Sequence, residues 1–140
     1  MSEITKDLTT LSTENSELES LLEIPTKPVK PPCVILCHPH PKYGGNMFDT
    51  LINHISSYLL DSGIATLRFN QRGVGMSSGE TGDGPEELKD TQSVVNMTTI
   101  NPKIDGSRLG IIGYSFGAWM ALESSLRSNS IKSLISIACP

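Results

Sequence analysis

The first 32 residues differ in pattern from the rest of the chain. Residues 1–24 are polar and rich in Ser and Thr, and their scattered apolar positions fit a hairpin that turns near 14–16, with 18–24 as its second strand. Residues 25–32 contain four prolines, which lack an N–H and therefore exclude a helix or an inner strand. We expect residues 1–32 to form N-terminal strands, or a hairpin, followed by a proline-rich connector.

From residue 33 onward, short apolar segments alternate with amphipathic ones. The expected strands are 33–37, 64–69, 108–113 and 133–138, and the expected helices are 47–60, 85–99 and 116–128. The run Cys33–Cys37 is continuously apolar, which is typical of a strand buried on both faces. Short strands separated by helices predict an α/β fold with a parallel sheet covered on both sides.

The ends of the first two helices can be placed by capping residues. Asn46 is expected to cap a first helix that starts at Met47, and Gly63 follows its end. Pro85 at the first helical position, followed by two acidic residues, marks the start of the second helix.

Composition narrows the class of protein. The 140 residues suffice for one domain, with 19% charged and 37% apolar residues and a net charge of −4. The charges are intermingled without a basic stripe, which argues against a nucleic-acid partner. No apolar run approaches the length of a membrane span, and the N-terminus lacks a signal-peptide pattern. The odd count of three cysteines favours a reducing compartment, so we expect a cytoplasmic protein.

The most informative motif is Gly113-Tyr-Ser-Phe-Gly117, an instance of G-x-S-x-G that lies between an expected strand and an expected helix. This is the context of a nucleophile elbow, a turn so sharp that the serine takes strained backbone angles and small neighbours are needed. Ser115 would then be exposed at the carboxyl end of a strand. The amide of Phe116, at a helix N-terminus, would point toward a developing oxyanion. The motif predicts acyl-transfer chemistry.

Two further segments, together with the elbow, resemble the α/β-hydrolases. Residues 68–77 read RFNQRGVGMS, similar to the loop after the family's fourth strand, and residues 37–45 read CHPHPKYGG where other members carry His-Gly. The combination is similar to a small, lid-poor subgroup of hydrolases related to dienelactone hydrolase. The resemblance covers roughly residues 18–140. It implies a doubly wound, mostly parallel sheet in which strand 33–37 lies between strands 64–69 and 108–113.

The resemblance also assigns roles to residues. Ser115 would be the nucleophile, and the backbone amides of Phe116 and of His40, or of a neighbour of His40 within residues 39–41, would form the oxyanion hole. A small ester or acyl compound would be the substrate, without a cofactor or metal ion. The residues expected to support the site are His38, Gly44, Gly45, Arg72, Gly113 and Gly117.

The chain departs from the family after the elbow. In the family the catalytic acid and then the histidine follow the serine along the chain, yet only 25 residues follow Ser115 and the only acid among them is Glu123. We therefore expect residues 33–140 to be a partial hydrolase domain that lacks the C-terminal strands, either a fragment, a truncated product, or a chain completed by another polypeptide. The strand 133–138 would be an exposed apolar edge that favours self-association.

Three functions remain open. The first is a serine hydrolase acting on ester or thioester bonds, inactive or weakly active as this chain because the catalytic acid and histidine are missing. The second is a non-catalytic relative that serves as a binding or interaction protein. The third, a metal-dependent hydrolase using His38 and His40, lacks further ligands in the sequence.

Overall fold

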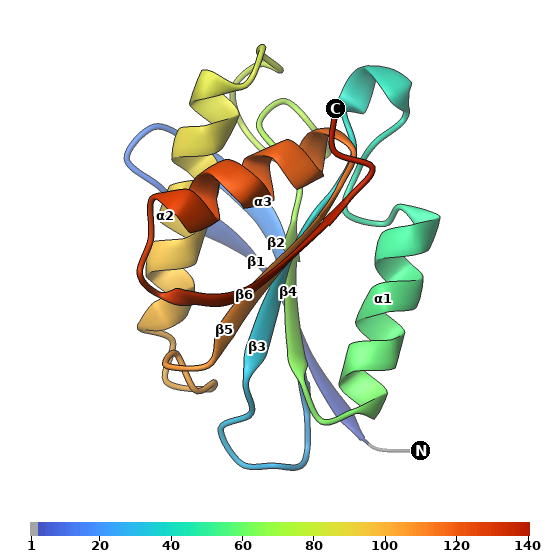
Figure 1. The fold of residues 1–140 in the computed structure, drawn as a ribbon, viewed down its shortest axis with the longest axis vertical. Coiled ribbons are helices and arrows are strands. Elements are labelled where there is room, and N and C mark those ends of the chain that lie inside the picture. Colours follow the sequence, from blue (N-terminus) through green and yellow to red (C-terminus); the bar gives the residue numbers. More distant parts are fainter. Residues whose placement is uncertain (1–2) are drawn as a thin grey trace.

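A single mixed sheet organises the chain, and helices cover both of its faces (Figure 1). The computed structural model describes residues 3–140. The strands are β1 (Ile4–Ser12), β2 (Glu17–Pro25), β3 (Cys33–Cys37), β4 (Ala65–Phe69), β5 (Leu109–Tyr114) and β6 (Ile131–Ile137). The α-helices are α1 (Thr50–Asp61), α2 (Pro85–Thr99) and α3 (Phe116–Leu126), and a short 3₁₀ helix, η1, spans Pro41–Tyr43.

The strand order β1-β2-β4-β3-β5-β6 confirms the doubly wound core. β3 lies between β4 and β5 and is parallel to both, and β6 is parallel to β5. Ile35 on β3 is level with Leu67 on one side and Ile111 on the other. The carboxyl ends of these parallel strands therefore meet at one edge of the sheet, where the loops that follow them can form a site.

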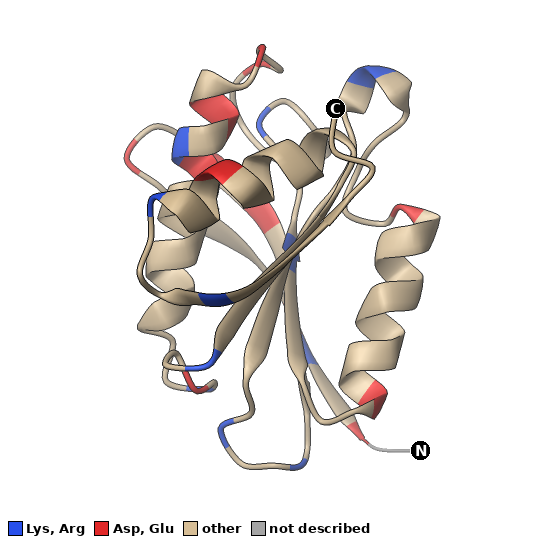
Figure 2. Cartoon of the chain, viewed as in Figure 1, with Lys and Arg blue, Asp and Glu red and all other residues tan. Residues whose placement is uncertain are grey.

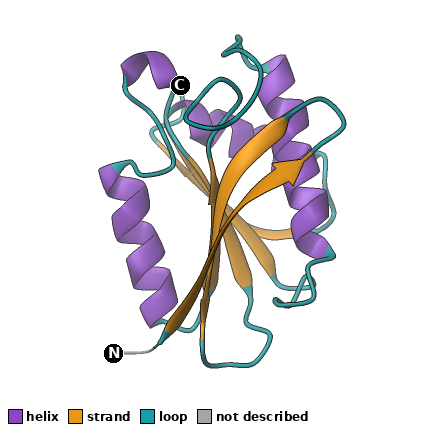
Figure 3. Cartoon of the chain, turned by 180° about the vertical axis from the view of Figure 1, so that it is seen from behind, coloured by secondary structure: helices purple, strands orange, loops and turns teal. Residues whose placement is uncertain are grey.

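The N-terminal segment forms the expected hairpin and extends the same sheet. β1 pairs antiparallel with β2, which pairs antiparallel with β4 (Figure 3). The turn closes through the Ser16 carbonyl, which accepts hydrogen bonds from the Thr13 N–H at 2.8 Å and from the Thr13 hydroxyl at 3.0 Å. Because β2 runs against β4, its first residues lie beside the loop that follows β4.

Alternation along β3 divides the core between the two faces. Cys33, Ile35 and Cys37 pack in the cluster under α2 and α3, whereas Val34 and Leu36 face α1. Burial raises the pKa of both Cys33 and Cys37 to about 12, so these thiols remain protonated and serve as packing groups. This confirms the expectation of a strand buried on both faces.

The start of the first helix was predicted wrongly. α1 begins at Thr50, and its cap is Asp49, whose carboxylate accepts the Ile52 N–H at 3.1 Å. Asn46 instead accepts the Phe48 N–H at 2.8 Å and closes a local turn. The Met47 N–H is bound by the Asn70 side chain at 2.8 Å, so the segment before α1 is held by the loop after β4.

Charged residues are distributed over the helices and loops with both signs interspersed (Figure 2). Within residues 3–140, no helix combines the length and the apolar character that crossing a bilayer requires.

β6 lies at one edge of the sheet and exposes apolar side chains on both faces. Leu134 is 36% exposed and Ile135 is 53% exposed. Ile135 and Ile137, together with Tyr58 and Leu59 of α1, line an apolar groove of about 350 Å³. The opposite edge strand, β1, carries Lys6 and Asp7, charges that disfavour pairing with another chain.

We expect the 140-residue chain to self-associate through β6, because residues 133–137 of this edge strand carry no charge and include exposed apolar side chains that can pair with another strand. Ile135→Lys introduces a charge at this edge and should shift the protein to a monomer in gel filtration with light scattering. The matched control is Leu126→Lys, at the end of α3, where the side chain is already 72% exposed; it should leave the association unchanged. An unmodified chain that remains monomeric as its concentration rises would contradict this expectation.

Candidate functional site

Ser115 occupies the turn between β5 and α3 in a strained conformation. Its φ is 56° and its ψ is −118°, in the region that L-residues rarely adopt. Such a residue costs about 1–3 kcal/mol and persists only where its surroundings hold it. Here the Ser115 N–H donates to the Ile137 carbonyl at 2.8 Å, and the Ser115 carbonyl accepts from Ala118 at 2.9 Å. Ser115 remains partly exposed at the carboxyl edge of the sheet.

The two glycines of the motif permit backbone-to-backbone contact. A Cβ on Gly113 would lie 2.1 Å from the carbonyl oxygen of Gly117, and a Cβ on Gly117 would lie 2.1 Å from the carbonyl oxygen of Cys37. Neither oxygen belongs to a flexible side chain that could move aside. The requirement for glycine at both positions, expected from the motif, therefore has a direct steric cause.

The loop after β3 lies against the elbow. The rings of His40 and Phe116 meet edge to face, with centroids 4.8 Å apart. Pro39 and Pro41 have no N–H, so His40 carries the only backbone donor of residues 39–41. Phe116 is the first residue of α3, and its N–H has no partner within the helix. The two residues whose amides are predicted to form the oxyanion hole are therefore in side-chain contact, while the direction and the catalytic role of their amides stay predictions.

Two glycines shape this loop. Gly44, with φ +82°, ends η1 and donates its N–H to Pro41. A Cβ on Gly45 would lie 1.8 Å from the Pro39 carbonyl oxygen, so the loop folds tightly back on itself. Both glycines were expected to let the loop approach a substrate. The contacts show that Gly45 is also needed for the loop to close.

His38 is fully buried and links the loops after β3 and β4. Its Nδ1 lies 2.6 Å from the Pro39 carbonyl oxygen, and its Nε2 accepts the Gln71 N–H at 3.0 Å. Because an amide N–H only donates, Nε2 must be unprotonated and Nδ1 carries the hydrogen. Burial lowers the pKa of His38 to about 4, so the ring is neutral at pH 7. His38 thus positions the loop that carries His40.

The third function considered above needs His38 and His40 as metal ligands. The lone pair of His38 is occupied by Gln71, and Nδ1 of His40 accepts the Lys42 N–H at 3.1 Å. Residues 3–140 contain no group of three His, Cys, Asp or Glu side chains placed to hold a metal ion. The geometry gives metal-dependent hydrolysis no support.

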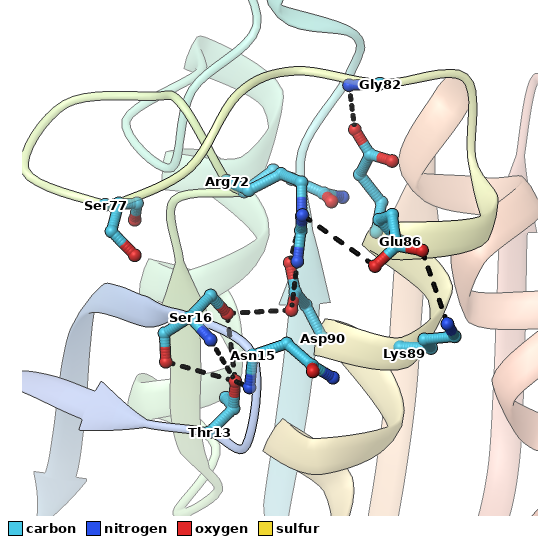
Figure 4. Close-up of polar contacts among 12 residues, drawn as sticks. Thr13, Asn15, Ser16, Arg72, Ser77, Gly82, Glu86, Lys89 and Asp90 are labelled. Atoms are coloured by element: carbon cyan, nitrogen blue, oxygen red, sulfur yellow. Dashed lines mark hydrogen bonds and ion pairs between the residues drawn. The ribbon is translucent and has the colours of Figure 1, made fainter.

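Arg72 joins the loop after β4 to α2 and to the hairpin. Its guanidinium forms a two-point ion pair with Asp90, with Nε–Oδ2 at 2.7 Å and Nη2–Oδ1 at 3.0 Å (Figure 4). The Ser16 hydroxyl donates to the same carboxylate at 2.7 Å. Asp90 is buried, and its hydrogen bonds raise the pKa of Arg72 above its ordinary value. Arg72 therefore ties the loop after β4 to α2, and through Asp90 to the hairpin, while its expected support of the site stays a prediction.

Sequence reasoning missed the partners in this network. Asp90 lies on the inner face of α2 with Thr91 and Val94, and a carboxylate at such a position signals a buried partner. Glu87 on the same face accepts the N–H groups of Gly82 and Gly84 at 2.7 and 3.2 Å. The two acidic residues on the inner face of α2 were the feature of the sequence from which this network could have been predicted.

Substitution of two glycines by alanine should distinguish a position that needs glycine because of a close contact from one that needs it because of a positive φ. We expect Gly117→Ala to reduce the free energy of unfolding by about 3 kcal/mol, because its methyl group meets the Cys37 carbonyl. Gly44→Ala should cost only about 1 kcal/mol, because its φ is positive but no neighbouring atom lies within 4 Å of the added carbon. Urea unfolding measures both. Equal costs would show that the elbow relaxes away from β3.

The ion pair between Arg72 and Asp90 predicts that two substitutions of acidic residues will differ in their effect on stability. Asp90→Asn leaves the largely buried Arg72 guanidinium with only the distant Glu86 carboxylate as counter-charge and should reduce the free energy of unfolding by about 3 kcal/mol. The control Glu86→Gln removes a partly exposed carboxylate 3.9 Å from Arg72 and should cost less than about 1 kcal/mol. Urea unfolding of the two variants measures the difference, and a stable Asp90→Asn protein would mean that Asp90 does not brace the loop.

Comparison with known proteins places this geometry in a family. A family model described as X-Pro dipeptidyl-peptidase (S15 family) matches residues 14–139. The chain is similar to the uncharacterized protein RP471 of Rickettsia prowazekii, with 36% identity over 109 residues, covering 78% of this chain and 45% of that protein. A 31.7 kDa uncharacterized protein of Escherichia coli is 29% identical over 81% of this chain and 39% of its own length.

Solved structures share the fold. A putative α/β-hydrolase from Agrobacterium tumefaciens is 31% identical with a TM-score of 0.85, and the match covers 95% of this chain and 60% of that one. An α/β serine hydrolase homologue from Coxiella burnetii is 30% identical with a TM-score of 0.85, over 96% of this chain and 63% of that one.

The chain thus spans under two thirds of the solved structures and under half of the curated relatives. The narrower likeness to dienelactone hydrolase stays a prediction. The family model covers nearly the whole chain, and the fold agrees with it. The chain belongs to the X-Pro dipeptidyl-peptidase family, within the α/β-hydrolase superfamily.

Proposed function

We propose that the chain carries the nucleophile and oxyanion-hole part of a serine hydrolase that acts on ester or thioester bonds of a small substrate. One observation carries the proposal, namely the strained Ser115 in the turn between β5 and α3, beside the His40 loop. A binding protein has no need of a serine in that conformation. Membership in a hydrolase superfamily supports the same conclusion.

The chemistry assigns a task to each group. Ser115 Oγ attacks the carbonyl carbon and gives its proton to a base, and the carbonyl oxygen becomes an oxyanion. The amides of Phe116 and His40 stabilise this oxyanion, each worth about 3–4 kcal/mol in typical sites. The C–O or C–S bond then breaks, the leaving group takes the proton, and the acyl group stays on Ser115 until water removes it.

Neither histidine of the loop after β3 offers a free lone pair for this proton. The Nε2 lone pair of His38 is held by the Gln71 N–H. Nδ1 of His40 accepts the Lys42 N–H, so in the neutral ring the hydrogen lies on Nε2. His54 lies on α1 beside the groove near β6 and is exposed. A serine without a base is a poor nucleophile at neutral pH.

The catalytic acid has no candidate after the elbow either. Glu123 is the only acid beyond Ser115, and its carboxylate pairs with Arg127 within α3. The structural hydrogen bonds that occupy the rings of His38 and His40 support a second candidate, a non-catalytic relative that binds a small acyl compound or another protein.

The test compares two lengths of the protein. We expect the 140-residue chain to hydrolyse p-nitrophenyl acetate near the background rate, unchanged by Ser115→Ala. A version extended through a catalytic acid and histidine should hydrolyse the ester and lose activity at least about a thousandfold on Ser115→Ala. The matched control, Ser125→Ala, removes a hydroxyl farther along α3 and should retain full activity.

The outcomes distinguish the candidates. An extended protein without Ser115-dependent turnover of any ester or thioester would favour the binding protein. Because the matched family is named for X-Pro dipeptidyl-peptidases, an X-Pro anilide belongs in the same panel. A robust Ser115-dependent rate from the short chain would contradict the argument from tautomers, and His40 would then be the base, since His38 is buried.

A further inference from the structure

A second cavity lies beside the His40 loop, bounded by the loops after β3 and β4 and by β2. Its volume is about 550 Å³. The residues that shape it are Glu19, Pro41, Gly44, Phe48, Asn70 and Gly75. Nothing in the acyl-transfer chemistry described above uses these side chains.

Of the residues that the structure describes, Glu19 is the only ionisable one that lines this cavity, and its carboxylate is held in place. Oε1 accepts the Asn70 Nδ2–H at 2.8 Å and the Met76 N–H at 2.9 Å. Asn70 is itself fixed, because its Oδ1 accepts the Met47 N–H and its backbone N–H donates to the Glu19 carbonyl. Among residues 3–140, no group donates a hydrogen bond to Oε2. One carboxylate oxygen is therefore oriented by the fold and free to accept from a ligand.

The hydrogen-bonded pair of Glu19 and Asn70 leaves no room for a side chain at position 75. A Cβ on Gly75 would lie 2.5 Å from both Glu19 Oε1 and Asn70 Nδ2. The loop therefore closes directly over the carboxylate–amide pair. The glycines at 44, 45, 73 and 75 leave the wall without side chains, so a ligand can approach the backbone closely.

Within residues 3–140, no ion pair neutralises the charge of Glu19. Arg68, whose guanidinium lies 5.6 Å from the Phe48 ring centroid, is paired with Glu23 at 2.8 Å. The apolar surfaces of Pro41, Phe48 and Val74 complete the lining. A small ligand with an apolar body and one positively charged, hydrogen-donating end matches this combination.

We propose that this cavity binds the primary ammonium group of a small ligand, with Glu19 as its counter-ion. Pro41 lines the cavity, and the adjacent His40 contacts Phe116, so the site adjoins the elbow. Its role as a subsite for an amine-bearing substrate rests on the proposed function. The binding of the amine does not.

The test is a ¹⁵N–¹H NMR titration of the 140-residue chain with n-butylammonium chloride at constant ionic strength. Saturable shifts are expected at the amides of Gly44, Gly45, Gly73, Gly75 and Met76. n-Butanol, which has the same apolar body without the charge, should bind at least tenfold more weakly. Equal binding of the alcohol, or no saturable shift at these amides, would overturn the proposal.

Glu19→Gln should reduce the affinity for butylammonium at least tenfold, because it removes the charge while its amide oxygen still accepts from Asn70 and Met76. Glu17→Gln, the same change two residues earlier on β2 at an exposed position, should bind as the unmodified protein does. Unchanged binding by Glu19→Gln would refute the role of Glu19. If that variant is misfolded, the comparison of amine with alcohol on the unmodified chain still decides.

The assay requires no turnover, so its failure and the failure of the proposed function are distinguishable. Amine binding that depends on Glu19 supports this site even if Ser115 hydrolyses nothing. Absence of binding refutes this site and leaves Ser115 untouched.

Discussion

The close approach of α3 to the end of β3 is the constraint on which the site depends. The elbow can fold only if no side chain separates Gly117 from the Cys37 carbonyl, where a Cβ would lie 2.1 Å away. This contact sets the start of α3, and with it the direction of the Phe116 N–H. It also fixes the strained Ser115, whose N–H is bound by the end of β6. The loop after β3 starts from the same point, so His40 meets Phe116 as a consequence.

Buried polar links hold the loops around this contact. His38 links the loops after β3 and β4 through one neutral imidazole, and Arg72 and Asp90 bind the second of these loops to α2. On the other face of the sheet, Arg68 pairs with Glu23 and donates to the Met47 carbonyl at 3.3 Å. Buried ion pairs add little net stability, since desolvation offsets their attraction. Their effect here is to fix which segments meet at the carboxyl edge.

Local and non-local features differ in how far the sequence reveals them. The elbow was predictable because a strand, G-x-S-x-G and a helix are contiguous and the steric requirement is local. The start of α1 was not, since the choice between Asn46 and Asp49 as cap depends on Asn70, which lies 23 residues beyond Met47 and binds its N–H. The role of Asp90 was not predicted either, because its partners Arg72 and Ser16 belong to other elements. Glu19 lies on a strand whose alternation is poor, and only the folded hairpin brings it to the loop after β4.

The two histidines in the loop after β3 hold structure around the elbow. Both ring nitrogens of His38 and the Nδ1 of His40 are occupied by structural hydrogen bonds. His38 is buried and neutral, and its only lone pair is held by the Gln71 N–H, so protonation of the ring would break the link between the loops after β3 and β4. A serine hydroxyl must lose its proton to a base as it attacks a carbonyl carbon. The turn therefore sets the position and the strained backbone of Ser115, whereas these two rings keep the neighbouring loop in place.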